Sequence, residues 1–149
     1  MNDTAARCPY RELRELTRSI GQAYESSFAE VGLTATQYWL LSEIKRLRSA
    51  RNVDIARAIG LDPSTLSRNL KPLLAEGWIR IEEGGDARSN GVVLTDSGLE
   101  RHALGQQQWQ LAKVKVVQAL GLPRVNRLYG LADESREVLG ASPSAFGER

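Results

Sequence analysis

The chain has 149 residues, of which 42% are hydrophobic and 26% are charged. This composition is typical of one globular domain and excludes a disordered or collagen-like chain. The 20 Lys and Arg residues nearly balance the 18 Asp and Glu residues, so the net charge of +2 permits nucleic-acid binding without arguing for it.

Membrane insertion, secretion and metal binding find no support in the sequence. No apolar run approaches the roughly 18 residues of a membrane helix, and residues 1–7 lack the apolar segment of a secretory signal. The single cysteine, Cys8, cannot form an internal disulfide, and the single histidine, His102, cannot build a histidine-rich metal site. We therefore expect a cytoplasmic protein with no membrane contact, no metal and no cofactor.

The first two helices are predicted from apolar spacing and from a cap. Apolar side chains at steps of three and four residues predict a helix from Pro9 to Val31, ended by Gly32. Thr34 and Gln37 have capping-box spacing and predict the start of a second helix. Basic residues crowd the end of that helix, at Lys45, Arg46, Arg48 and Arg51.

The next two helices are predicted to form a helix-turn-helix. A short helix runs from about Val53 to Ile59. Asp62 is a good N-cap and Pro63 is tolerated in a first helical turn, so another helix begins there, with Gly77 as its C-cap. Its expected buried stripe consists of Leu66, Leu70, Leu73 and Leu74.

From residue 78 the periodicity changes from helical to alternating. Residues 78–82 (WIRIE) predict a strand, residues 84–91 (GGDARSNG) a turn-rich tip, and residues 92–94 a returning strand. Together they predict a two-stranded β-ribbon, or wing.

Two more helices follow the ribbon. Thr95 caps a long helix that reaches about Leu120, and Pro123 begins a last one. Since a helix-turn-helix followed by a hairpin is a winged helix, the sequence predicts a mainly α fold with a small β-wing. Helices at both ends of the chain flank this winged helix.

The helix that begins at Pro63 carries polar side chains on the face opposite its leucines. No acidic residue lies between Pro63 and Ala75. A helix in the major groove presents its N-terminal turns to the bases, and Ser, Thr, Asn and Arg side chains can reach base edges and phosphates. The alternative is an ordinary solvated face. The predicted DNA contacts are Ser64, Thr65, Ser67, Arg68, Asn69 and Lys71.

The tip of the ribbon holds Asp86 and Arg88. An arginine on a wing can enter the minor groove, where narrow stretches concentrate negative potential, and a carboxylate can hold its guanidinium in place. The alternative is a surface salt bridge worth about 0–1 kcal/mol. Acidic and basic residues are equal in number over residues 51–91, which argues weakly against strong non-specific binding.

Three segments resemble the MarR family of bacterial transcriptional regulators. They are residues 32–41 (GLTATQYWLL), 62–68 (DPSTLSR) and 86–98 (DARSNGVVLTDSG), within a similarity that spans roughly residues 13–139. The most specific element is the wing pattern D-x-R-S, which includes Ser89, followed by V-x-L-T-x-x-G. The resemblance implies that the helix from Pro63 enters the major groove and that Arg88, supported by Asp86, enters the minor groove.

The resemblance also implies how the chain is organised and how it acts. It implies a single domain over residues 1–149, with a winged helix over 33–95 and dimerisation helices over 9–31 and 96–139. It implies a nucleoid-associated homodimer that binds a pseudo-palindromic operator in double-stranded DNA, usually as a repressor. Apolar faces on the terminal helices favour a two-fold dimer independently, because a lone winged helix does not need them. Packing of these helices within one chain is the alternative.

Family members often release DNA when a small aromatic compound binds between the dimer region and the winged helix, or when a cysteine is oxidised. Cys8, with Arg7 and Arg11 nearby, is the candidate for oxidation, although it precedes the first helix and an incidental thiol is the alternative. For the aromatics, ordinary core packing is the alternative. The candidate ligand-binding residues are Tyr24, Tyr38, Trp39 and Trp109.

No catalytic motif is present in the sequence. It has no G-x-S-x-G, no P-loop and no G-x-G-x-x-G, so we expect no enzymatic activity. The expected function is that of a homodimeric DNA-binding repressor released by a small aromatic effector. Two alternatives stay open: a redox-sensing repressor, and a winged-helix protein-interaction module that does not bind DNA.

Overall fold

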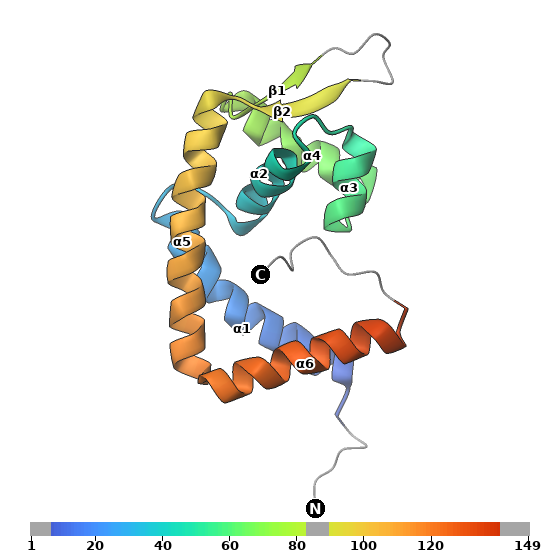
Figure 1. Ribbon diagram of the computed structural model, residues 1–149, viewed down its shortest axis with the longest axis vertical. Helices are drawn as coiled ribbons and strands as arrows, with labels where there is room; N and C mark the ends of the chain where they lie inside the picture. The colour runs from blue at the N-terminus through green and yellow to red at the C-terminus, as the bar shows by residue number, and fades with distance from the viewer. Residues whose placement is uncertain (1–6, 83–89, 141–149) are drawn as a thin grey trace, which may run out of the picture.

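A computed structural model describes residues 7–82 and 90–140, and its elements follow the predicted order (Figure 1). The helix α1 is long, α2 to α4 are shorter, β1 and β2 form the ribbon, and α5 leads to α6. Their bounds are α1 Pro9–Ala29, α2 Ala35–Leu47, α3 Asn52–Ile59, α4 Pro63–Ala75, β1 Ile79–Glu82, β2 Gly91–Leu94, α5 Asp96–Leu120 and α6 Leu122–Val138.

The molecule has a winged-helix lobe and a second region built from helices. In Figure 1, α2, α3, α4 and the strands cluster at one end of α5, whereas α1 and α6 lie toward its other end. The helix α5 has 25 residues and joins the two regions. The predicted mainly α fold with a small β-wing is confirmed.

The core lies in the winged-helix lobe. Phe28 at the end of α1 is fully buried there, which anchors α1 to the lobe, while the first half of α1 is exposed. Burial of such side chains contributes about 1.5–3 kcal/mol each. The other fully buried large side chains are Leu40, Leu41, Ile44, Ile55, Leu66 and Leu73.

The ribbon has a short third partner that the sequence did not predict. β1 pairs antiparallel with β2, with Ile79 opposite Leu94 and Glu82 opposite Gly91. The link between α2 and α3 joins this sheet through one residue. The Ala50 N–H donates to the Val92 carbonyl at 3.2 Å, and the Val92 N–H donates to the Ala50 carbonyl at 2.8 Å.

The structure corrects the end of the fourth helix. Leu74 was expected in the buried stripe, but its side chain is 38% exposed. At 100° per residue it lies about 80° around the helix from Leu66, at the edge of the stripe rather than on it. The C-cap is Glu76 rather than Gly77, which follows it with φ of +69° and ends the helix in the left-handed conformation that glycine favours.

The end of the first helix is also corrected. It stops at Ala29 rather than Val31, because the chain already turns at residues 30–32. There the Gly32 N–H donates to the Ala29 carbonyl and the Leu33 N–H to the Phe28 carbonyl. The capping box that Thr34 and Gln37 predicted for the second helix is confirmed, with both reciprocal hydrogen bonds formed.

The first turn of α5 is fixed to the base of the wing. The Thr95 hydroxyl donates to the Gly77 carbonyl at 2.6 Å and accepts from the Gly98 N–H at 3.1 Å. A Cβ on Gly98 would lie 1.9 Å from the carbonyl oxygen of Trp78. The T-x-x-G part of the wing pattern therefore has a structural cause: Thr95 bonds α5 to the wing base, and only glycine at position 98 leaves room for the wing-base backbone.

Arg101, one turn further along α5, ties three segments together. Its Nη1 donates to the Val31 carbonyl at 2.6 Å, just after α1, and its guanidinium lies 4.9 Å from the centre of the Trp78 ring. A cation over an indole ring is attractive, by about 0.5–1 kcal/mol at exposed sites and more when desolvated. The end of α1, the second turn of α5 and the wing base are thus held together by one side chain.

Replacing Gly98 by alanine should destabilise the fold, because the new methyl group meets backbone atoms that cannot rotate away. We expect a loss of about 1–3 kcal/mol in the free energy of unfolding, measured by thermal or urea denaturation. Gly21→Ala in α1 is the control, since a Cβ there contacts nothing and alanine favours a helix by about 1 kcal/mol. Equal midpoints for the two variants would contradict the close approach.

Candidate nucleic-acid interface

The N-terminal turns of α4 are presented to solvent. Gly60, with φ of +68°, ends α3 in a left-handed turn, and Asp62 begins α4 after one intervening residue. The buried face of α4 packs in the core, so the opposite face is open. Of the six predicted DNA contacts on α4, four are exposed and two, Thr65 and Asn69, are half-buried.

The Asp62 carboxylate organises this helix end. Its Oδ1 accepts from the Ser64 and Thr65 N–H groups at 3.0 and 2.9 Å. The Ser64 and Thr65 hydroxyls also donate to it, each at 2.5 Å. These hydroxyl groups, followed by the backbone N–H groups, hold the pKa of Asp62 far below its usual value, so the carboxylate stays ionised at neutral pH.

The hydrogen-bond directions decide what the helix end can offer to a ligand. Because both hydroxyl hydrogens point back at Asp62, the outward-facing lone pairs of Ser64 and Thr65 are acceptors. Arg68 adds a donor group, and one of its nitrogens lies 3.4 Å from the Thr65 hydroxyl oxygen. Oxygen acceptors beside a guanidinium suit base edges that carry both amino groups and ring acceptors.

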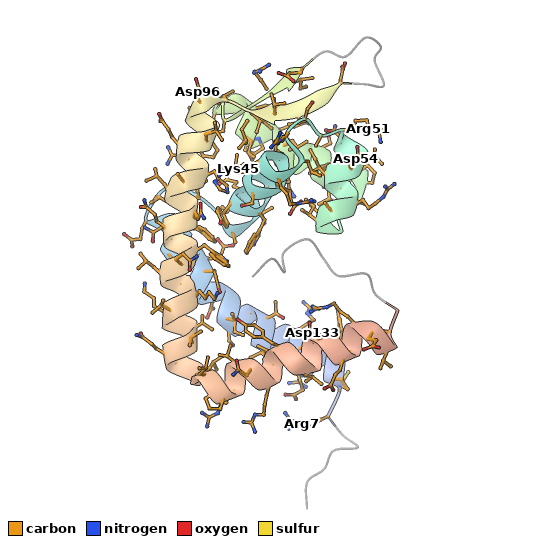
Figure 2. The ribbon with its side chains drawn as sticks, viewed as in Figure 1. Arg7, Lys45, Arg51, Asp54, Asp96 and Asp133 are labelled. Carbon is orange, nitrogen blue, oxygen red and sulfur yellow. The ribbon has the colours of Figure 1, made fainter. Side chains whose placement is uncertain are left out.

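Two other arginines in the winged-helix lobe are already paired. Arg51 binds Asp54 through two hydrogen bonds, at 2.8 and 3.1 Å, at the start of α3 (Figure 2). On β1, Arg80 lies 2.6 Å from Glu82. Arg68 and Lys71, in contrast, form no ion pair with any residue in the described ranges. Arg68 and Lys71 therefore leave positive charge available on α4 itself.

The predicted wing contacts Asp86, Arg88 and Ser89 lie outside the described residues. The strands that precede and follow them lie at the end of the molecule opposite α6 (Figure 1).

A pocket of about 510 Å³ lies between α2 and α5. Its size falls within the range of small-molecule sites. Three of the four predicted ligand residues line it, namely Tyr38, Trp39 and Trp109. Tyr24 does not: it packs against the core from α1. The remaining lining residues, which the sequence did not single out as a site, are Ser42, Glu43, Lys45, Arg46, Arg48, His102 and Gln106.

The pocket combines aromatic walls with positive charge. The Lys45 ammonium lies 3.4 Å from Nδ1 of His102. Because an ammonium can only donate, this ring nitrogen accepts, and the imidazole is neutral with its proton on Nε2. Burial, followed by the Lys45 charge, lowers the pKa of His102 to about 4. Tyr38 stacks on the same ring with a centroid distance of 5.6 Å.

The carboxylate in the pocket does not neutralise Lys45. Glu43 is buried and accepts two hydrogen bonds from Arg46, at 3.0 and 2.8 Å. Within residues 7–82 and 90–140, Lys45 and Arg48 form no ion pair. Lys45 and Arg48 lie at the C-terminal end of α2. Their two positive charges, which no carboxylate in these ranges pairs with, lie beside the three aromatic rings of the pocket.

Cys8 is exposed at the N-cap of α1. The two cations expected to activate its thiol are both paired elsewhere, because Arg7 binds Glu12 at 2.6 Å and Arg11 binds Glu15 at 3.0 Å.

The described part of the chain holds neither a metal site nor a membrane-spanning helix. No group of three or more His, Cys, Asp or Glu residues there has the arrangement of a metal site. Among the same residues, no helix has the length and apolar character needed to cross a bilayer.

The MarR family model matches residues 33–89 of the sequence. The chain is 30% identical to the transcriptional regulator MosR of M. tuberculosis in a crystal structure with DNA. That match covers 89% of this chain and 98% of that one, with a TM-score of 0.72. A second crystal structure of MosR gives 26% identity over the same shares, with a TM-score of 0.70.

A mutant MarR of E. coli, complexed with operator DNA, has a TM-score of 0.77. The match covers 84% of this chain and 91% of that one; at 20% identity the likeness shows the fold alone. The comparison with curated proteins gives no match. The winged-helix lobe, the polar N-terminal end of α4 and the identity with MosR agree, and the chain belongs to the MarR family of DNA-binding transcriptional regulators.

Proposed function

We propose that the protein is a homodimeric repressor that binds a pseudo-palindromic operator and is released by a small aromatic anion. It acts by binding and not as an enzyme. The observation that carries the DNA-binding part is the exposed polar N-terminal end of α4, where Asp62 holds the hydroxyl groups of Ser64 and Thr65 as acceptors beside Arg68. MosR and E. coli MarR, two of the similar proteins, were crystallised with DNA.

In this proposal, α4 reads bases in the major groove and the wing arginine enters the minor groove. Ser64 and Thr65 accept hydrogen bonds from base amino groups, since their hydrogens are engaged by Asp62. Arg68 donates to a purine edge, and Lys71, one turn further on, binds a phosphate. Ser67 and Asn69 complete the polar face, and Arg88 takes the minor groove with Asp86 and Ser89 beside it.

Substitution of Arg68 and of Arg88 should affect DNA binding differently. Footprinting first identifies the operator sequence, and titration of that DNA then measures the affinity of each variant. Arg88→Ala should lower affinity about tenfold or more with fold and dimer intact, and Arg68→Ala should change preference at one half-site position by about 1–3 kcal/mol. Arg11→Ala, at the far end of α1, removes the same charge as a control. Unchanged affinity for Arg88→Ala would remove the wing from the mechanism, and affinity that is insensitive to salt would favour a protein-interaction module.

The dimer is proposed because a single chain leaves the terminal helices uncovered. In α6 only Val125 is buried, whereas Leu131 is 59% exposed and Val138 is 85% exposed. Exposed apolar side chains gathered on the terminal helices favour an interface, and a two-fold pair is the commonest arrangement. Further exposed apolar side chains lie on the first half of α1, the second half of α5 and on α6: Tyr10, Leu13, Leu111, Val114, Leu122 and Tyr129.

The dimer should be sensitive to one polar substitution on α6. Light scattering should give twice the mass of the chain for the wild type. Leu131→Gln should shift the mass toward that of one chain and weaken operator binding, because it places an amide in the apolar interface. Leu99→Gln is the control, since Leu99 is also exposed but lies at the wing end of α5. A wild-type protein with the mass of one chain would contradict the proposal.

The pocket between α2 and α5 is the proposed effector site. Its aromatic rings suit a planar ring, and the Lys45 ammonium, which has no carboxylate partner in the described ranges, suits an anionic group on that ring. The paired state of Arg7 and Arg11 leaves the thiol of Cys8 without an activating cation, so oxidation is not favoured as the signal.

Charge selectivity tests this assignment. Benzoate should quench the fluorescence of Trp39 and Trp109 at about tenfold lower concentration than benzamide, which has the same shape without the charge. Lys45→Met should remove this difference, whereas Lys115→Met, on the exposed surface of α5, should preserve it. Equal affinity of the wild type for the two compounds would contradict an anionic effector.

A further inference from the structure

The residue that follows α2 has a backbone conformation that side chains other than glycine rarely adopt. Arg48 has φ of 65° and ψ of −62°, and it is the one non-glycine residue with positive φ within the described residues. The Ser49 N–H donates to the Leu47 carbonyl at 2.9 Å. These features define a γ-turn of the rare, strained hand, with Arg48 at its centre. Glycine would adopt it without strain.

This strained turn lies between the pocket and the wing. Arg48 itself lines the pocket. Two residues later, Ala50 makes its two hydrogen bonds with Val92 in β2. Ser49 is in close contact with the same strand, because a Cβ on Gly91 would lie 2.2 Å from the Ser49 hydroxyl oxygen. A change of backbone conformation at Arg48 therefore shifts the residues that hold β2.

Arg48 also carries a charge on which an anionic ligand can act. Its guanidinium forms no ion pair inside the described ranges, so an anion in the pocket attracts it. A ligand shifts a conformational equilibrium only as far as it binds one state better than the other. An anion in the pocket binds more tightly when the turn is open and the Arg48 guanidinium can approach it. Opening the turn also relieves its strain, which offsets the loss of the Ala50–Val92 hydrogen bonds.

We propose that Arg48 couples the effector pocket to the wing. In the free protein the strained turn holds Ala50 against β2 and keeps the wing in place for DNA. An anion in the pocket draws Arg48 out of the left-handed region, which separates Ala50 from Val92 and displaces the wing. Arg48 is thus a positioning residue. The inference rests on the proposed effector function, and it adds the path by which occupancy reaches the DNA-binding surface.

Three variants of the full chain separate strain from charge. Arg48→Gly removes both the backbone strain and the positive charge. Arg48→Ala removes the charge and keeps the strain, and Arg48→Lys keeps the strain and the charge. Without any ligand, hydrogen exchange at the Ala50 and Val92 amides should be about tenfold slower in Arg48→Gly than in Arg48→Ala. Opening the turn relieves backbone strain in the alanine variant, whereas glycine has no strain there to relieve. Equal exchange in the two variants overturns the proposal.

Benzoate then tests the coupling. In the wild type and in Arg48→Lys it should accelerate exchange at the Ala50 and Val92 amides and release operator DNA, followed by fluorescence anisotropy. Arg48→Ala and Arg48→Gly both lack the charge that the anion attracts, so both should keep operator DNA bound at benzoate concentrations that saturate their pockets. Equal release of DNA by Arg48→Ala and by the wild type at saturating benzoate overturns the proposal.

Failure of the coupling and failure of the effector function give different results. If benzoate binds the wild type and releases DNA but Arg48→Ala releases it equally well at saturating benzoate, the effector function stands and the coupling through Arg48 is wrong. If benzoate does not bind the wild type, the effector function is wrong and the liganded part of this inference falls with it. The exchange comparison without ligand still decides whether the turn holds the wing.

Discussion

The arrangement of the whole chain depends on how closely the first turn of α5 approaches the backbone of the wing base. Gly98 admits the Trp78 carbonyl where any side chain would collide, and the Thr95 hydroxyl joins the two segments from the other side. Arg101 then adds the end of α1 to the same junction. Because of these contacts, the wing, the long helix and the first helix meet at one point, and the α2–α5 pocket lies further along the same helix.

The surface proposed to bind DNA depends on the carboxylate of Asp62. Asp62 caps α4 and accepts both hydroxyl hydrogens from its first turn. The negative charge also suits the positive end of the helix dipole. Ionised at neutral pH, this carboxylate fixes Ser64 and Thr65 as acceptors before any ligand arrives. The helix end is thereby preorganised, which reduces the entropy that binding would otherwise lose.

The sequence predicted the features that depend on local chemistry and failed where distant segments meet. Caps at Thr34, Asp62 and Thr95 each involve a few neighbouring residues, so their spacing was enough to place the helices. The single-residue pairing of Ala50 with Val92 has no local signal. Helical spacing also could not tell that Trp109 lines the pocket and Tyr24 does not, because both are half-buried aromatics that pack against the core.

The length of α5 has a mechanical consequence. At 25 residues it extends for about 37 Å, with the wing base fixed to one end and α6 to the other. Such a helix acts as a lever arm, so that a tilt of about 5° at its far end moves the wing end by about 3 Å, close to the 3.4 Å rise of one base step. A rearrangement too small to disturb the packing of either lobe would therefore be enough to put the protein out of register with its operator.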